Sequence, residues 1–133
     1  MRIMVIDDSK IDLFIAERLI TLSDISTDII LCSSAEDGLK YLKQNCTTLE
    51  KLPELILLDI HMPEMDGFEF LEEFEQLPSA LVQDIGVFLL TSSVDRKDLA
   101  RSAANPLVMK LIMKPLNTEV LAQCIENYFF NQN

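Results

Sequence analysis

Four short apolar segments of this chain end in side chains that could take part in chemistry. Two carboxylates, Asp7 and Asp8, follow the first segment, and a third, Asp59, follows another. A hydroxyl, Thr91, and an ammonium, Lys114, follow the other two. Three carboxylates brought together would repel one another and raise their pKa values unless a cation lay among them. Oxygen ligands favour Mg²⁺, which takes few protein carboxylates and keeps several waters.

The same residues predict phosphoryl-transfer chemistry. A carboxylate beside a divalent cation can act as a nucleophile toward a phosphoryl group. The cation would neutralise charge on the transferring oxygens, and Lys114 could pair with another oxygen. Thr91 could donate a hydrogen bond to a third. The set therefore predicts an aspartyl phosphate.

These side chains can meet only if the apolar segments are parallel strands. The segments that predict strands are Ile3–Ile6, Ile29–Cys32, Leu55–Leu58, Val87–Leu90 and Leu107–Met113. Several are continuous rather than alternating, as expected for strands buried on both faces of a parallel sheet. Polar, helix-like stretches lie between them, so we predict a doubly wound α/β fold with helices on both faces. Ligands bind at the carboxyl ends of strands in such sheets.

Helical spacing supports this alternation. Apolar residues follow it from Ile11 through Phe14, Ile15 and Leu19 to Leu22, with Ser9 as a candidate N-cap. Further helices are expected over 35–42, 68–74 and 120–129, and a weaker, shorter one over 95–104. Segments 44–53 and 77–84 are predicted to be surface loops, the second an alternative extension of the preceding helix.

Composition narrows the class of protein. The chain has 133 residues, enough for one domain of the usual ~100–150 residues. Its net charge of −11 argues against nucleic acid and anionic membrane surfaces as partners. The N-terminal segment lacks the pattern of a signal peptide, so we expect a cytoplasmic protein. Three cysteines without paired spacing, Cys32, Cys46 and Cys124, are predicted to be reduced thiols, and a single histidine argues against zinc.

Four motifs carry a family resemblance. They are IDDS at 6–9, LLDIHMPEMDG at 57–67, LLTSS at 89–93 and MKP at 113–115. Together they resemble the receiver domain of two-component response regulators, in the same order and over essentially the whole chain. The resemblance implies a five-stranded, flavodoxin-like sheet of the chemotaxis-receiver type, with strand order 2-1-3-4-5.

The resemblance also implies roles for the residues around the acceptor. Asp59 would take a phosphoryl group from a phosphohistidine on a sensor histidine kinase or a histidine phosphotransfer protein. Asp8 would bind Mg²⁺ directly and Asp7 would bind it through water. His61 would offer its backbone carbonyl to the metal, while its imidazole is expected to face solvent or pack within the loop.

Other positions are assigned in the same way. Thr91 matches the switch hydroxyl, and Lys114 matches the lysine that precedes a cis bond to Pro115. Gly67 fits a loop position where glycine permits a backbone conformation that is costly to other residues. Leu111 departs from the family pattern, which usually has Tyr or Phe there, so the aromatic part of the switch is in doubt.

The expected output is protein contact. The last predicted helix ends near Phe130, so residues 1–133 are expected to form one receiver domain without an output domain. It would be no enzyme beyond the phosphorylation and dephosphorylation of its own Asp59. An unknown downstream protein would bind near a basic cluster, and the chain would be a monomer or a weak homodimer through Phe129 or Phe130. The cluster consists of Arg96, Lys97, Arg101 and Lys110.

Three alternatives remain open at this point. A phosphatase of the haloacid dehalogenase type would need a second acid two residues after the nucleophile, where this chain has His61. A flavodoxin-like carrier of FMN would need a hydroxyl-rich loop in place of Asp7 and Asp8. A receiver-shaped interaction module that is never phosphorylated is the third.

Overall fold

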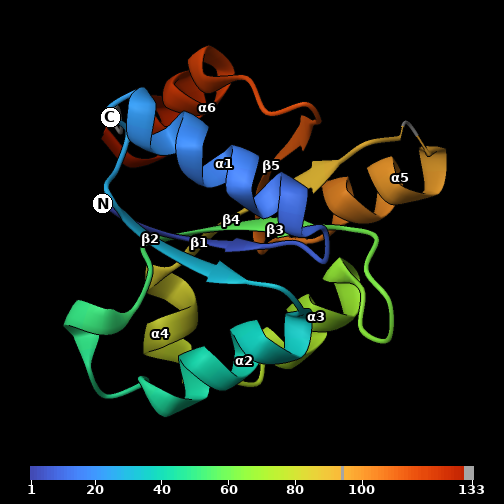
Figure 1. The fold of residues 1–133 in the computed structure, drawn as a ribbon. Coiled ribbons are helices and arrows are strands. Elements are labelled where there is room, and N and C mark those ends of the chain that lie inside the picture. The colour runs from blue at the N-terminus through green and yellow to red at the C-terminus, as the bar shows by residue number, and fades with distance from the viewer. Residues whose placement is uncertain (94, 131–133) are drawn as a thin grey trace.

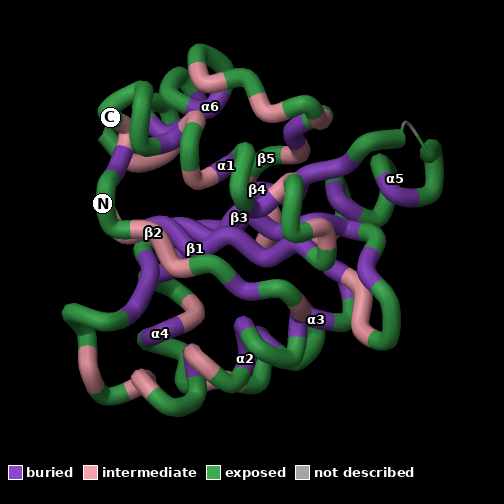
Figure 2. The backbone as a smooth tube through the Cα atoms, in the orientation of Figure 1, coloured by how far each residue is buried: buried purple, intermediate pink, exposed green. Residues whose placement is uncertain are grey.

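Five segments form one parallel sheet in the computed structural model, which describes residues 1–93 and 95–130. The strands are β1 (Arg2–Ile6), β2 (Asp28–Cys32), β3 (Leu55–Asp59), β4 (Gly86–Thr91) and β5 (Val108–Met113). Their order is β2-β1-β3-β4-β5 and every pairing is parallel, which confirms the predicted flavodoxin-like fold. Strands β3 and β4 are buried along their whole length, as their continuous apolar sequences predict (Figure 2).

Helices cover both faces of the sheet (Figure 1). Helices α1 (Lys10–Leu22) and α6 (Thr118–Ile125) lie on one face, with a π-helical turn at Glu126–Phe130 continuing α6. The other face carries α2 (Ala35–Gln44), α3 (Gly67–Phe74) and α4 (Ser79–Asp84). Helix α5 (Arg96–Ala104) lies at the right of Figure 1, on the side toward which the strands point. The sheet thus separates two apolar core clusters.

Helix α1 begins as predicted, but most of the apolar residues whose spacing predicted it do not face the core. The Ser9 hydroxyl caps it by accepting from the Asp12 N–H. The residues that face the sheet are Leu13, Ala16 and Ile20. Ile11, Phe14, Ile15 and Leu22, which carry the helical spacing in the sequence, are all exposed. Two apolar stripes share this helix, and spacing alone does not decide which of them faces the core.

The two predicted loops contain short helices. Leu49–Lys51 forms a 3-10 turn within 44–53. Residues 77–84 do not extend α3, because a separate helix, α4, begins after Pro78, whose carbonyl accepts the N–H groups of Leu81 and Val82. Leu81 is buried in the core cluster on the face of the sheet that also carries α2 and α3, so this segment packs on the sheet rather than projecting from it.

Of the two C-terminal phenylalanines, one packs in the core and the other is exposed. Phe129 packs edge-on against Phe88, with ring centroids 6.2 Å apart, while Phe130 is exposed. All three cysteines are free. Among the residues described, no helix has the length and apolar character needed to span a bilayer.

The orientation of α1 predicts that substitutions on its buried and exposed faces differ in their effect on the free energy of unfolding. Ile20 is fully buried, so Ile20→Ala should lower the free energy of unfolding by about 2–4 kcal/mol. Phe14 is exposed and touches the Arg18 guanidinium, so Phe14→Ala should cost less than about 1 kcal/mol. Urea denaturation of both variants checks this, and a larger loss for Phe14→Ala would contradict the orientation of the helix.

Candidate functional site

The carboxyl edge of the sheet collects the predicted site residues. Asp7 and Asp8 follow β1, Asp59 ends β3, and Lys114 follows β5. One carboxylate oxygen from each of the three aspartates lies within 4.8 Å of the other two. Asp7 and Asp59 are buried and Asp8 is exposed, so the cluster opens to solvent on one side. Three oxygen donors converging in this way fit a hard divalent cation such as Mg²⁺.

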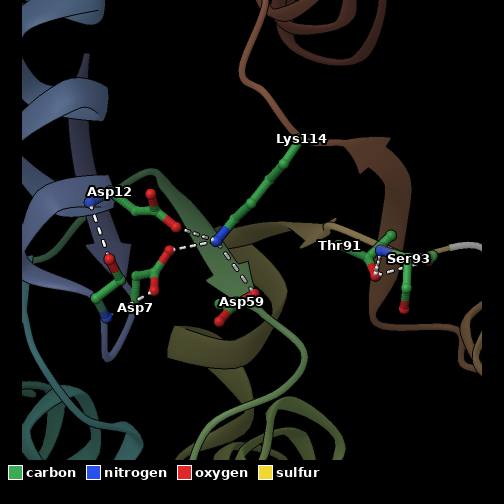
Figure 3. A network of polar contacts seen from close by, with 7 residues as sticks. Asp7, Asp12, Asp59, Thr91, Ser93 and Lys114 are labelled. Carbon is green, nitrogen blue, oxygen red and sulfur yellow. Dashed lines mark hydrogen bonds and ion pairs between the residues drawn. The ribbon is translucent and has the colours of Figure 1, made fainter.

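The ammonium of Lys114 lies among carboxylates (Figure 3). Its Nζ is 2.6 Å from Asp7 Oδ2, 3.0 Å from Asp12 Oδ2 and 3.4 Å from Asp59 Oδ1. Asp12 is the member of this network that sequence reasoning missed. Its only signal was an acidic residue in the first turn of α1, which is common at helix N-termini for other reasons.

The turn between β1 and α1 orients two of these carboxylates at once. Asp7 Oδ1 accepts the N–H of Ser9 at 2.9 Å, which leaves Oδ2 for Lys114. The Ser9 hydroxyl accepts the N–H of Asp12 at 3.2 Å, which fixes the first turn of α1. Helix capping and the placement of site residues therefore depend on the same turn around Ser9.

Burial and charge shift the pKa values of the central pair. Burial raises the pKa of Asp59 to about 6; the Asp7 charge adds to this, and the Lys114 ammonium opposes it. Burial by itself lowers the pKa of Lys114. Hydrogen bonds to Asp7 and Asp12, together with the charge of Asp59, more than compensate and raise that pKa above its ordinary value. Lys114 is therefore firmly cationic, and Asp59 is the carboxylate whose charged form the site disfavours.

Thr91 reaches the same edge, but its hydroxyl is directed elsewhere. It is buried, and its Oγ donates to the carbonyl of Ser93 at 3.0 Å and accepts the Ser93 N–H at 3.3 Å. Figure 3 shows this pair to the side of the carboxylates. Leu111 is half-buried and packs against the core cluster on the α2 and α3 face, where the family usually has an aromatic ring. The Lys114–Pro115 peptide bond is cis, as the resemblance implies.

The loop after β3 is held closed at its base. Ile60 donates its N–H to the carbonyl of Leu90, and its own carbonyl accepts the Gly67 N–H at 2.8 Å. A Cβ on Gly67 would lie 2.8 Å from the Asp59 carbonyl oxygen, so a larger residue would push on the end of β3. The expected reason for this glycine was wrong: no glycine in the described chain has positive φ, and that conformation falls on Glu64, at 68°. Gly67 is needed for space.

Two side chains near the site have partners that the sequence did not predict. The His61 side chain faces solvent as expected, with 57% of it exposed, and its Nε2 also donates to Asp98 Oδ2 of α5 at 2.7 Å. The Arg101 guanidinium lies 4.1 Å from the centroid of the Phe68 ring. One member of the predicted basic cluster is therefore engaged with α3, while Arg96, Lys97 and Lys110 remain exposed.

Comparison with known proteins agrees with this geometry. The sequence matches the family model of the response regulator receiver domain over residues 3–126. The chain belongs to the response regulator receiver family. This is a signalling family of phosphoacceptor modules and not a catalytic enzyme family, so the phosphatase and FMN-carrier alternatives are set aside.

Solved receivers share the whole fold. A response regulator receiver protein from Dyadobacter fermentans is 33% identical with a TM-score of 0.87, covering 97% of this chain and 98% of that one. A two-component response regulator from Cytophaga hutchinsonii is 26% identical with a TM-score of 0.86, covering 95% and 94%.

Curated relatives differ in length. The response regulator Rcp1 from Synechocystis is 31% identical over 101 residues, which are 75% of this chain and 67% of Rcp1. The regulator ARR2 from Arabidopsis thaliana is 28% identical over 91% of this chain, but the chain spans only 16% of ARR2. It spans 14% of the sensor histidine kinase CheAY from Helicobacter pylori.

The raised pKa of Asp59 predicts that, in the absence of divalent cations, the free energy of unfolding depends on pH. Folding raises the pKa of Asp59, so the folded protein holds this proton more tightly than the unfolded chain does. The resulting contribution to the free energy of unfolding is fully present below about pH 4 and is lost as pH rises through about 6. Asp59→Asn removes this charge and should raise the free energy of unfolding at pH 7 by roughly 1–3 kcal/mol. Urea denaturation in EDTA measures the difference. At pH 4 the two proteins should be nearly equal, and a less stable variant at pH 7 would contradict the raised pKa.

Proposed function

We propose that this receiver accepts a phosphoryl group on Asp59 from a phosphohistidine, in a reaction that requires Mg²⁺. The observation that carries the proposal is the convergence of Asp7, Asp8 and Asp59 within 4.8 Å, with the Lys114 ammonium 3.4 Å from Asp59. The phosphodonor would be a sensor histidine kinase or a histidine phosphotransfer protein, which places its action in the cytoplasm. One relative, CheAY, is itself named a sensor histidine kinase.

The residues divide the chemistry among them. A carboxylate oxygen of Asp59 attacks phosphorus and forms the new P–O bond. The P–N bond to the donor imidazole breaks, and its electron pair returns to that nitrogen, which takes up a proton. Asp7, Asp8 and Asp59, with the carbonyl of His61, would hold Mg²⁺, which supplies charge neutralisation at the phosphoryl oxygens. Lys114 pairs with another of these oxygens and is kept cationic by its carboxylate neighbours.

The response would begin at Thr91. In the present arrangement its hydroxyl is committed to Ser93, so it must leave that turn to donate to a phosphoryl oxygen. Ser93 precedes Arg96, the first residue of α5, by three positions in the sequence, so this movement would reach a surface helix. The surface formed by Arg96, Lys97 and Lys110 is the candidate contact for a downstream protein, since these basic side chains are exposed on a chain of net charge −11.

The exposed apolar stripe of α1 is the candidate contact for the phosphodonor. Ile11, Phe14 and Ile15 are 72%, 61% and 44% exposed on the helix that also carries Asp12. A cavity of about 310 Å³ adjoins them, lined by Ile15 and Leu116 as well as Lys114. Apolar surface beside a polar reaction site is typical of protein contacts. A phosphohistidine protein seated here would place its imidazole near Asp59.

Intact mass spectrometry tests the proposal. With Mg²⁺ and acetyl phosphate, the wild type should gain the mass of one phosphoryl group, and EDTA should prevent the gain. Asp59→Asn should gain none. Asp28→Asn is the matched control, because Asp28 pairs with Arg2 at 2.9 Å, away from the site, and it should react like the wild type. An unmodified wild type would favour the interaction module that is never phosphorylated, and an adduct on Asp59→Asn would place the acceptor elsewhere.

Docking through α1 predicts a difference between donors. Phe14→Ala should slow transfer from a phosphorylated histidine phosphotransfer domain about tenfold relative to its rate with acetyl phosphate, as expected for ~1.4 kcal/mol of lost contact. Val120→Ala, which truncates a comparably exposed apolar side chain on α6, should leave this ratio unchanged. Rapid-quench transfer assays measure both rates. An equal effect of the two substitutions would remove α1 as the docking surface.

A further inference from the structure

Helix α5 is fastened to the segment that follows the acceptor strand by two side-chain contacts. His61 Nε2 donates to Asp98 Oδ2 at 2.7 Å, and the Arg101 guanidinium lies over the Phe68 ring at 4.1 Å. Both contacts join α5 to residues that come after Asp59, and they lie one turn apart on α5. No other side-chain hydrogen bond or ion pair of the described residues joins α5 to the site loops.

The His61–Asp98 contact is asymmetric in burial. The Asp98 side chain is 9% exposed, and the His61 side chain is 57% exposed. A buried carboxylate without a donor is strongly disfavoured, so Asp98 depends on the imidazole for a partner. His61 has no such dependence, because water could satisfy its ring. The contact therefore fixes the position of α5 relative to His61.

The chain path connects this contact to the acceptor. The Ile60 N–H donates to Leu90, so the backbone is tied to the sheet as far as residue 60. His61 is the first residue beyond that tie and is two residues from Asp59. A rearrangement at Asp59 would therefore reach His61 through two peptide units. From His61 it would reach α5 without passing through β4.

We propose that Asp98 is a positioning residue that acts through His61, and that this pair transmits the state of Asp59 to α5. The proposal rests on the phosphorylation of Asp59 proposed above. It gives α5 two connections to the site: one along the chain from Thr91, and one across from His61. Leu111 has neither ring nor hydroxyl, so the aromatic route usual in the family is missing, and the His61–Asp98 pair offers a direct alternative.

A local role for Asp98 makes a different prediction. Asp98 lies in the first turn of α5, where a carboxylate stabilises a helix by itself. In that case Asp98→Ala would loosen α5, and His61→Ala, which lies outside the helix, would not. If the pair positions α5, both substitutions loosen it and the double variant adds little, because each removes the same contact.

Hydrogen exchange of the unphosphorylated protein separates these cases. His61→Ala and Asp98→Ala should each raise the exchange rate of α5 amides roughly five- to tenfold, and the double variant should exchange no faster than the faster single variant. Asp28→Ala, which breaks the remote ion pair with Arg2, should leave α5 unchanged. An effect of Asp98→Ala alone, or full additivity, would overturn the proposal.

The phosphorylated state tests transmission itself. Wild type treated with Mg²⁺ and acetyl phosphate should change the exchange of α5 amides. Asp98→Ala should gain the same phosphoryl mass but lose most of that change, and Asp98→Asn, which keeps an oxygen to accept from His61, should retain it. An unmodified wild type would overturn the proposed function itself. Modified proteins whose α5 responds equally in wild type and Asp98→Ala would leave that function standing and overturn the His61–Asp98 route.

Discussion

One ammonium among several carboxylates is the interaction on which the site depends. Lys114 contacts Asp7, Asp12 and Asp59, and its closest approach is to Asp7 rather than to Asp59. Burial, together with the neighbouring Asp7 charge, raises the pKa of Asp59 to about 6, because a single ammonium offsets these effects only in part. The arrangement is therefore suited to a divalent cation, which would offset the excess negative charge of the carboxylates.

The surrounding fold keeps that imbalance in place. Parallel strands bring their carboxyl ends to one edge, and the Ser9 turn orients Asp7 and Asp12 together. Gly67 lets the loop after β3 close directly against the carbonyl of Asp59. Two other side chains at this edge have partners outside the cluster: Thr91 bonds to the Ser93 carbonyl, and His61 bonds to Asp98 of α5. Local turns and caps, rather than the sheet alone, thus decide which side chains are available to a phosphoryl group.

The sequence predicted the sheet and the site edge well, because continuous apolar strands and the polar residues that end them leave strong patterns. The prediction failed where more than one structure is compatible with the same sequence pattern. Helix α1 has two apolar stripes, and only packing selects the one containing Ile20. The contacts of Asp12 and His61 are tertiary: their partners lie 102 and 37 residues away, with no motif to join them. The cause of the glycine at 67 was also invisible, since close approach of two backbone segments leaves no periodic signal.

Titration of Asp59 tests the central account most directly. Carbon-13 NMR of the Asp59 side-chain carboxyl, assigned by its absence from Asp59→Asn, would follow protonation with and without Mg²⁺. The account predicts a pKa of about 6 in EDTA and a marked fall when Mg²⁺ is added. An ordinary aspartate pKa near 4 that does not respond to Mg²⁺ would contradict it.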